Sequence, residues 1–177
     1  MCGRFTSSAS PEELMRKFGV TILQNLRPKW NVAPSQQALV IVRHGLQNEA
    51  VMAQWGLPPK SAKHSFLINA RAETVTEKPT FRDAFHYRRC LVVASGWYEW
   101  SAPKTPWHLQ LYDGGVMAFA GLLFGQKGQH RFIVLEAADK MNASSSNALL
   151  KVLEEPPKHT IFILIAEQFS RLLPTII

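Results

Sequence analysis

The sequence predicts an α+β fold in which strands outnumber helices. Over residues 1–135, segments rich in β-branched and aromatic residues recur between turn-forming residues, while only two segments have helical signals. Beyond them, residues 132–177 have the pattern of a strand, a helix and a second strand. The 177 residues suit one domain with an appended segment.

Bulk composition limits the function classes. A hydrophobic fraction of 46% allows an ordinary core, and no apolar run is long enough for a membrane span, so we expect no membrane partner. The polar residues after Met1 do not resemble a signal peptide, and two cysteines suit a reducing, cytoplasmic setting. No zinc-type spacing occurs, so we expect no cofactor. A net charge of +7 favours an anionic partner, nucleic acid first, although solubility alone could explain it.

Local signals predict the first elements. Ser10 is a helix N-cap, Pro11 suits the first turn, Glu13 completes a capping box and Gly19 ends a helix over 11–18. Two strands are predicted next, over 38–43 and 50–55. The residues between them, 45–48, include glycine and asparagine, which favour a turn, so the two strands are expected to form a hairpin.

Two residues near these strands have a structural and a functional interpretation. Residues 30–34 predict an irregular loop, in which Asn31 either binds a ligand or makes a turn. Trp55 stands at a strand end before Gly56, where tryptophan is either a plug of the core or a platform for a nucleic-acid base.

The next segment predicts a polar strand and a basic helix. A strand over 65–69 leads into Asn69, Arg71 and Glu73, which would share one face because side chains alternate along a strand. That face is either exposed to solvent or lines a cleft. In a cleft, the guanidinium of Arg71 could bind a phosphate group. A helix over 77–89 would pack through its phenylalanines and present positive charge on its other side.

An apolar strand over 90–95 follows, so Cys90 is expected to be an inert core thiol. In the next strand Glu99 has three aromatic neighbours, which would desolvate it and raise its pKa toward the range useful for proton transfer. The alternative is a surface glutamate. Residues 107–112 and 116–122 predict a hairpin with its turn at 113–115.

The N-terminus offers distinctive chemistry. If Met1 is removed, Cys2 carries an α-amine and a thiol on adjacent carbons, and both are partly nucleophilic at neutral pH. Such a 1,2-aminothiol condenses with an aldehyde to an imine, which the thiol closes to a thiazolidine. The alternative is an ordinary frayed terminus.

Four segments, in this order, resemble the SOS-response-associated peptidase (SRAP) family of abasic-site shielding proteins: Met1-Cys2-Gly3-Arg4-Phe5, Asn31-Val32-Ala33-Pro34, Asn69-Ala70-Arg71-Ala72-Glu73 and Ser95-Gly96-Trp97-Tyr98-Glu99-Trp100. The resemblance covers about residues 1–124 and predicts a domain over 1–131. It implies a barrel-like β core with flanking helices and a positive groove for single-stranded DNA.

The resemblance also implies a reaction and its residues. Cys2 would form a thiazolidine crosslink with the ring-opened aldehyde of an abasic site and would remove the residue before it, hence "peptidase". Asn69 would position the amine, and Glu99 would be the acid/base. The DNA-binding residues would be Arg4, Asn31, Trp55, Arg71 and Trp100.

The sequence departs from the family pattern at one functional point. The family has a segment of the type Ile-His-x-Arg-Met-Pro after the last strand, and neither His130 nor His159 aligns with its histidine. Loss of a proton-transfer group typically lowers a rate by about 10²- to 10⁴-fold. We therefore expect slowed crosslinking, with a catalytically impaired DNA-binding module as the alternative.

Residues 132–177 resemble a different family, the clamp-loader subunits of bacterial DNA polymerase III. The matching residues include Asn147-Ala148-Leu149-Leu150-Lys151 and Glu154-Glu155-Pro156-Pro157, but no GxxxxGK[ST] loop is present to cradle a nucleotide. The sequence thus predicts a chimera with its junction between 125 and 138. The second segment would bind a clamp-loader partner or a second copy, in a cytoplasmic, nucleoid-associated setting.

Overall fold

A computed structural model describes residues 3–21, 25–59, 66–102, 104–126 and 128–136, and these residues form ten strands, two α-helices and one 3₁₀ helix. The predicted clamp-loader-like helix and second strand therefore lie outside the described residues. The elements are β1 (Phe5–Ser7), α1 (Pro11–Phe18), β2 (Lys29–Val32), β3 (Gln37–His44), β4 (Gln47–Trp55), β5 (Asn69–Arg71), η1 (Ala72–Thr74), α2 (Pro79–Tyr87), β6 (Arg89–Ala94), β7 (Gly96–Ala102), β8 (Thr105–Leu109), β9 (Met117–Phe124) and β10 (Arg131–Glu136).

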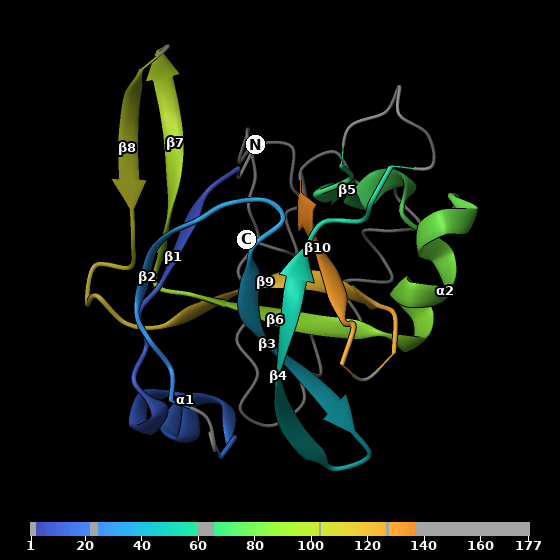
Figure 1. The fold of residues 1–177 in the computed structure, drawn as a ribbon, viewed down its shortest axis with the longest axis horizontal. Coiled ribbons are helices and arrows are strands. Elements are labelled where there is room, and N and C mark those ends of the chain that lie inside the picture. Colours follow the sequence, from blue (N-terminus) through green and yellow to red (C-terminus); the bar gives the residue numbers. More distant parts are fainter. Residues whose placement is uncertain (1–2, 22–24, 60–65, 103, 127, 137–177) are drawn as a thin grey trace, which may run out of the picture.

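A closed sheet forms the centre of the molecule (Figure 1). Its strand order is β4-β3-β6-β9-β10-β5, and the first residues of β10 also pair in parallel with β4, which closes β4, β3, β6, β9 and β10 into a barrel; β5 pairs with the last residues of β10. The interior is filled by alternate residues of these strands, among them Trp55, Phe119 and Phe132. The α+β fold with a barrel-like core is confirmed, and β10, which the sequence allowed to belong to either segment, is part of this barrel.

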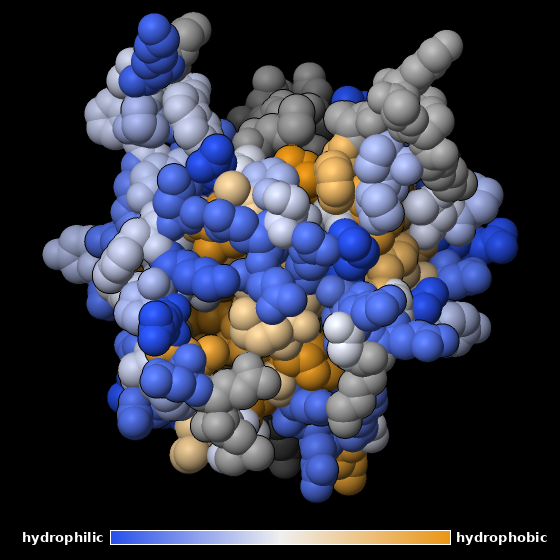
Figure 2. All heavy atoms as spheres, in the orientation of Figure 1, coloured by the Kyte–Doolittle hydropathy of each residue, from blue (hydrophilic) through white to orange (hydrophobic). Residues whose placement is uncertain are grey.

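A smaller antiparallel sheet, in the order β2-β1-β7-β8, packs on the barrel. Its inner face carries Phe5, whose ring lies 5.1 Å from Trp55 and 6.0 Å from Phe119 between centroids. Val32 lies opposite Phe5 and Trp97 lies on its other side, so the same face is apolar across three strands. The β7–β8 hairpin stands away from the body, and its tip is strongly hydrophilic (Figures 1 and 2).

The two helices cover separate patches of the barrel's outer face. Helix α1 packs over a cluster that contains Leu39, Ile41 and Val93, and α2 packs over Leu122 and Ile133. The predicted capping box of α1 is present, with Ser10 and Glu13 exchanging hydrogen bonds of 2.8 and 3.2 Å. Gly19 ends α1 at φ 63°, a conformation that glycine adopts without steric cost.

The structure corrects three predictions. Residues 30–32, the first part of the loop expected over 30–34, belong to β2 because this segment pairs with β1. Strand β8 pairs with β7, whereas β9 pairs with β6 and β10; residues 113–115 therefore connect two sheets, and no hairpin joins β8 to β9. Glu73 does not share the face of Asn69 and Arg71, because β5 ends at Arg71 and a 3₁₀ turn follows.

None of the helices in the described part of the chain is both long and apolar enough to cross a membrane.

Candidate functional site

The outer face of the smaller sheet joins two of the predicted DNA-binding residues. The backbone N–H of Tyr98 donates to the carbonyl of Arg4 at 2.9 Å, which sets β1 beside β7. On the other side of β1, Nη1 of Arg4 donates to Oδ1 of Asn31 at 3.0 Å. The structure thus brings Arg4 and Asn31 together, and the amide orients the guanidinium.

Aromatic residues lie on β2 and β7, the strands on either side of β1. The hydroxyl of Tyr98 donates to the carbonyl of Trp30 at 3.0 Å, and its ring lies 6.4 Å from that of Trp100. Trp30 is 65% exposed and Trp100 is 46% exposed, so a large part of each side chain is accessible to solvent. Aromatic faces beside a guanidinium suit the bases and phosphates of a single strand.

A contact between β1 and β8 supports this face. Thr6 Oγ1 and His108 Nε2 share a hydrogen bond of 3.1 Å although β7 lies between their strands. The imidazole crosses β7 above Gly96, where an added Cβ would lie 2.5 Å from Nε2 of His108 and 2.5 Å from the carbonyl oxygen of Leu109. His108 also lies 4.9 Å from the ring of Tyr98. The sequence analysis missed this contact, since no local pattern indicates a pair 102 residues apart.

Glu99 occupies the opposite face of β7 from Tyr98 and Trp100, because side chains alternate along the strand. It shares a face with Trp97, which packs toward Phe119 in the barrel. The predicted enclosure of Glu99 by three aromatic rings is therefore wrong: two of the three point to the other side of the sheet. Glu99 is half-buried.

Asn69 and Arg71 lie on β5 and share one of its faces. They pair with Val134 and Glu136 of β10, which anchors the strand to the barrel. Asn69 is half-buried and Arg71 is exposed, so the guanidinium is accessible to an anion. The start of β1, strand β5 and the β7–β8 hairpin lie at the same end of the molecule (Figure 1).

Trp55 is not available to stack on a base. It is fully buried in the barrel, with its ring nearly parallel to that of Phe132 at 6.1 Å between centroids. Its indole N–H donates to the carbonyl of Ile68 at 2.9 Å. The structural interpretation, a plug of the core, is the correct one.

Of the two cysteines, only Cys90 is among the described residues, and Cys2 lies outside them. Cys90 is buried, and burial raises the pKa of its thiol far above the ordinary range because the thiolate would be desolvated. It is therefore the inert thiol that the sequence predicted. Across the part of the chain that the structure describes, no three metal-ligating side chains gather into a group.

The profile of the SRAP family, described as "SOS response associated peptidase (SRAP)", matches residues 1–145. The chain belongs to the SRAP family. Among its relatives, abasic site processing protein YoaM of Bacillus subtilis is 39% identical over 133 aligned residues, and the match covers 69% of this chain and 59% of YoaM. The chain thus spans somewhat over half the length of this relative. The crystal structure of a phage-related protein from Bordetella bronchiseptica is similar, with a TM-score of 0.63 at 26% identity, and the match covers 76% of this chain and 68% of that one.

A second family matches the end of the chain. The profile described as "DNA polymerase III, delta subunit" matches residues 123–177 and so overlaps the SRAP match over 123–145. DNA polymerase III subunit delta' of Pseudomonas aeruginosa is 53% identical over 51 residues, which are 29% of this chain and 16% of that subunit. The overlap includes β10 (131–136), the strand that closes the SRAP barrel.

Proposed function

We propose that this protein binds abasic sites in single-stranded DNA and forms a covalent thiazolidine crosslink through Cys2. The observation that carries the proposal is the SRAP match, which includes Cys2 and is accompanied by relatives named abasic site processing proteins. The contact of Arg4 with Asn31 supports it, because Arg4 follows Cys2 by two residues and its guanidinium is held in place by the amide oxygen of Asn31.

The reaction needs no cofactor. After Met1 is removed, the α-amine of Cys2 attacks the aldehyde carbon of the ring-opened sugar, and one water leaves as the imine forms. The thiol sulfur then bonds to the imine carbon, and its proton is transferred to the nitrogen, which closes the five-membered ring. In this proposal Asn69 positions the amine, and Glu99 transfers protons during imine formation.

The DNA would lie across the end of the molecule that carries β1, β5 and the hairpin. Arg4 and Arg71 would hold phosphates, Asn31 would orient Arg4, and Trp100 would stack on a base. Trp55 has no place in this list, since it is buried.

The test is a denaturing gel of the protein with an oligonucleotide that contains one abasic site. We expect a covalent adduct that survives denaturation without reductant. Cys2→Ala retains an α-amine and should give only an imine, so its adduct should require borohydride trapping. An equally stable adduct in Cys2→Ala without borohydride would refute the role of the thiol.

A second function is favoured by the match at residues 123–177. In it the chain is a fusion whose second segment, 132–177, binds a clamp-loader subunit or another copy, and the SRAP part only binds DNA. Binding to purified polymerase III clamp-loader subunits together with no covalent adduct would favour it. In either case we propose a cytoplasmic, nucleoid-associated protein.

A further inference from the structure

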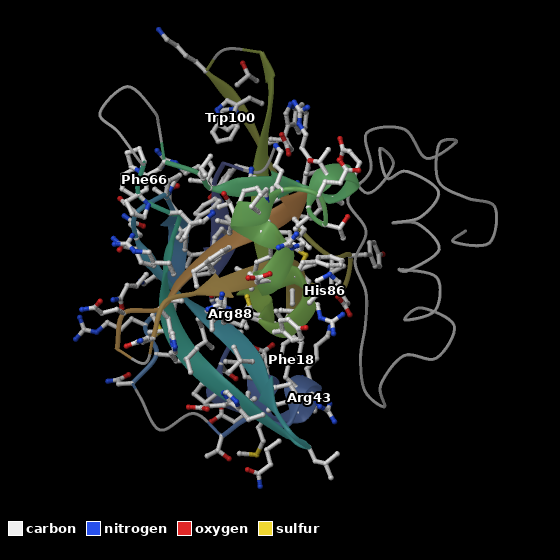
Figure 3. All side chains as sticks on the ribbon, turned by 90° about the vertical axis from the view of Figure 1, so that its right-hand side faces the viewer. Phe18, Arg43, Phe66, His86, Arg88 and Trp100 are labelled. Carbon is white, nitrogen blue, oxygen red and sulfur yellow. The ribbon has the colours of Figure 1, made fainter. Side chains whose placement is uncertain are left out.

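The basic residues around the end of α2 and the start of β6 are not used by the candidate site. Exposed Arg88 and Arg89 follow the helix directly, and His86 lies in its last turn. Figure 3 shows His86, Arg88 and Arg43 on one side of the molecule, with Trp100 at the far end on the hairpin. We define the basic ridge as Arg43, Arg88 and Arg89, with His86 beside it.

Strand register explains why the two strand residues share a face. Ile41 of β3 lies opposite Leu91 of β6, and both contribute to the cluster beneath α1. Arg43 comes two residues after Ile41, and Arg89 comes two residues before Leu91. Because side chains alternate, both arginines lie on the outer face of the sheet, just beyond the part that α1 covers.

The other helix limits the ridge on its second side. Arg89 lies opposite Leu122 of β9, a residue that is buried beneath α2. The strand residues of the ridge therefore lie on a strip of the barrel that neither of the two described helices covers. The side chains at these positions are exposed, and they are guanidinium groups.

Acidic groups do not neutralise the ridge. Within the described residues, no carboxylate lies within 4.0 Å of the charged nitrogens of Arg43, Arg88 or Arg89, and the nearby acids are already used: Glu49 pairs with His44 at 3.4 Å, and Asp83 with Arg82 at 3.6 Å. Concentrated positive charge without counter-charge attracts a polyanion and repels other cations.

We propose that the basic ridge is a second contact for nucleic-acid phosphates, separate from the candidate site. It rests on the DNA-binding part of the proposed function, and it does not depend on the chemistry of Cys2. Along β6 the rise per residue puts Arg89 about 17 Å from Ala94, where the strand turns into the smaller sheet. Figure 3 places Arg43 and Trp100 toward opposite ends of the molecule, so the ridge would act on DNA that flanks the lesion.

The experiment measures binding of undamaged fluorescent oligonucleotides as salt is varied. The ridge variant is Arg43→Gln with Arg89→Gln. Its matched control is Arg27→Gln with Arg82→Gln, which removes the same charge: Arg27 is exposed in the segment before β2, and Arg82 is already paired with Asp83. Probes of about 6 and about 30 nucleotides bracket the span of typical single-strand sites, and a duplex of the longer probe tests double-stranded DNA.

The slope of log affinity against log salt is negative. The loss of two phosphate contacts should reduce its magnitude by about 1.4 for the long single strand and by about 1.8 for the duplex. The single-strand affinity of the parent should then fall about sevenfold more than that of the ridge variant between about 50 and about 200 mM salt. A reduced slope on either long probe supports the proposal and shows which form of DNA the ridge binds. On the short probe, the ridge variant should have the same salt slope as the parent. The control variant should have the parental slope on every probe.

Two results would overturn the proposal: a parental slope for the ridge variant on both long probes, or equal losses in the ridge and control variants. Because the probes lack abasic sites, a failure of crosslinking does not affect this outcome. Conversely, the ridge variant should still crosslink a short abasic oligonucleotide.

Discussion

Replacement of Trp55 by phenylalanine tests whether this residue belongs to the core or to the DNA site. The change removes the hydrogen bond of the indole N–H to the carbonyl of Ile68, worth about 1 kcal/mol. That carbonyl also accepts from the N–H of Val134 at 3.1 Å, so the acceptor keeps a partner and the cost stays near this value. The smaller ring leaves a partial void between Phe5 and Phe132, for about 1 kcal/mol more.

The expected loss in the free energy of unfolding is therefore about 2 kcal/mol for Trp55→Phe and about 4 kcal/mol for Trp55→Ala. Denaturant unfolding followed by tryptophan fluorescence measures it, and oligonucleotide binding is measured under conditions where each variant is folded. DNA affinity should stay at the parental value. An affinity weakened about tenfold, with unchanged unfolding, would refute the placement of Trp55 in the core.

Trp100 provides the matched comparison, because it is 46% exposed on the projecting hairpin. Trp100→Ala should change the free energy of unfolding by less than about 0.5 kcal/mol. It should weaken single-strand binding by about 1–3 kcal/mol, the usual contribution of one stacked base. Unchanged DNA affinity in this variant would remove Trp100 from the site.

Three further outcomes follow from local geometry. Gly96→Ala should destabilise the chain by about 1–3 kcal/mol in thermal unfolding. Adding His108→Ala should restore only part of this loss, because the carbonyl oxygen of Leu109 remains 2.5 Å from the new Cβ. Full recovery would refute the close approach of the Leu109 carbonyl to Gly96. Ser10→Ala should cost about 1 kcal/mol in the same assay through loss of the helix cap, and no change would contradict the capping box. Burial raises the pKa of the Cys90 thiol, which stays protonated from neutral pH to pH ~9. A maleimide should therefore label Cys90 only after unfolding, and mass mapping would show this. Rapid labelling of the folded protein would contradict it.

Local signals in the sequence predicted the elements that depend on neighbours in the chain. The cap residues specify α1, and consecutive apolar residues over 38–42 and 50–53 specify β3 and β4, whose pairing needs only a short turn. The β8–β9 hairpin was wrong because Asp113, Gly114 and Gly115 form a good turn sequence in a segment whose strands have better partners elsewhere. Strand choice of this kind depends on tertiary packing that no local window contains.

The candidate site shows the same division. Arg4 and Asn31 could be selected from residue type and family resemblance, and the structure joins them. The support from Thr6 and His108 could not, since it depends on a register between strands far apart in the sequence. Trp55 was ambiguous because burial at a strand end depends on what packs above it, and only the fold supplies Phe5.

The central claim is that Cys2 reacts as a 1,2-aminothiol, and intact mass spectrometry of the crosslinked product tests it most directly. The adduct with an abasic oligonucleotide should have the mass of the chain without Met1, plus the ring-opened DNA, minus one water. Asn69→Ala and Glu99→Gln should form the same product more slowly. An adduct that retains Met1, or a product of equal stability from Cys2→Ala, would contradict the account.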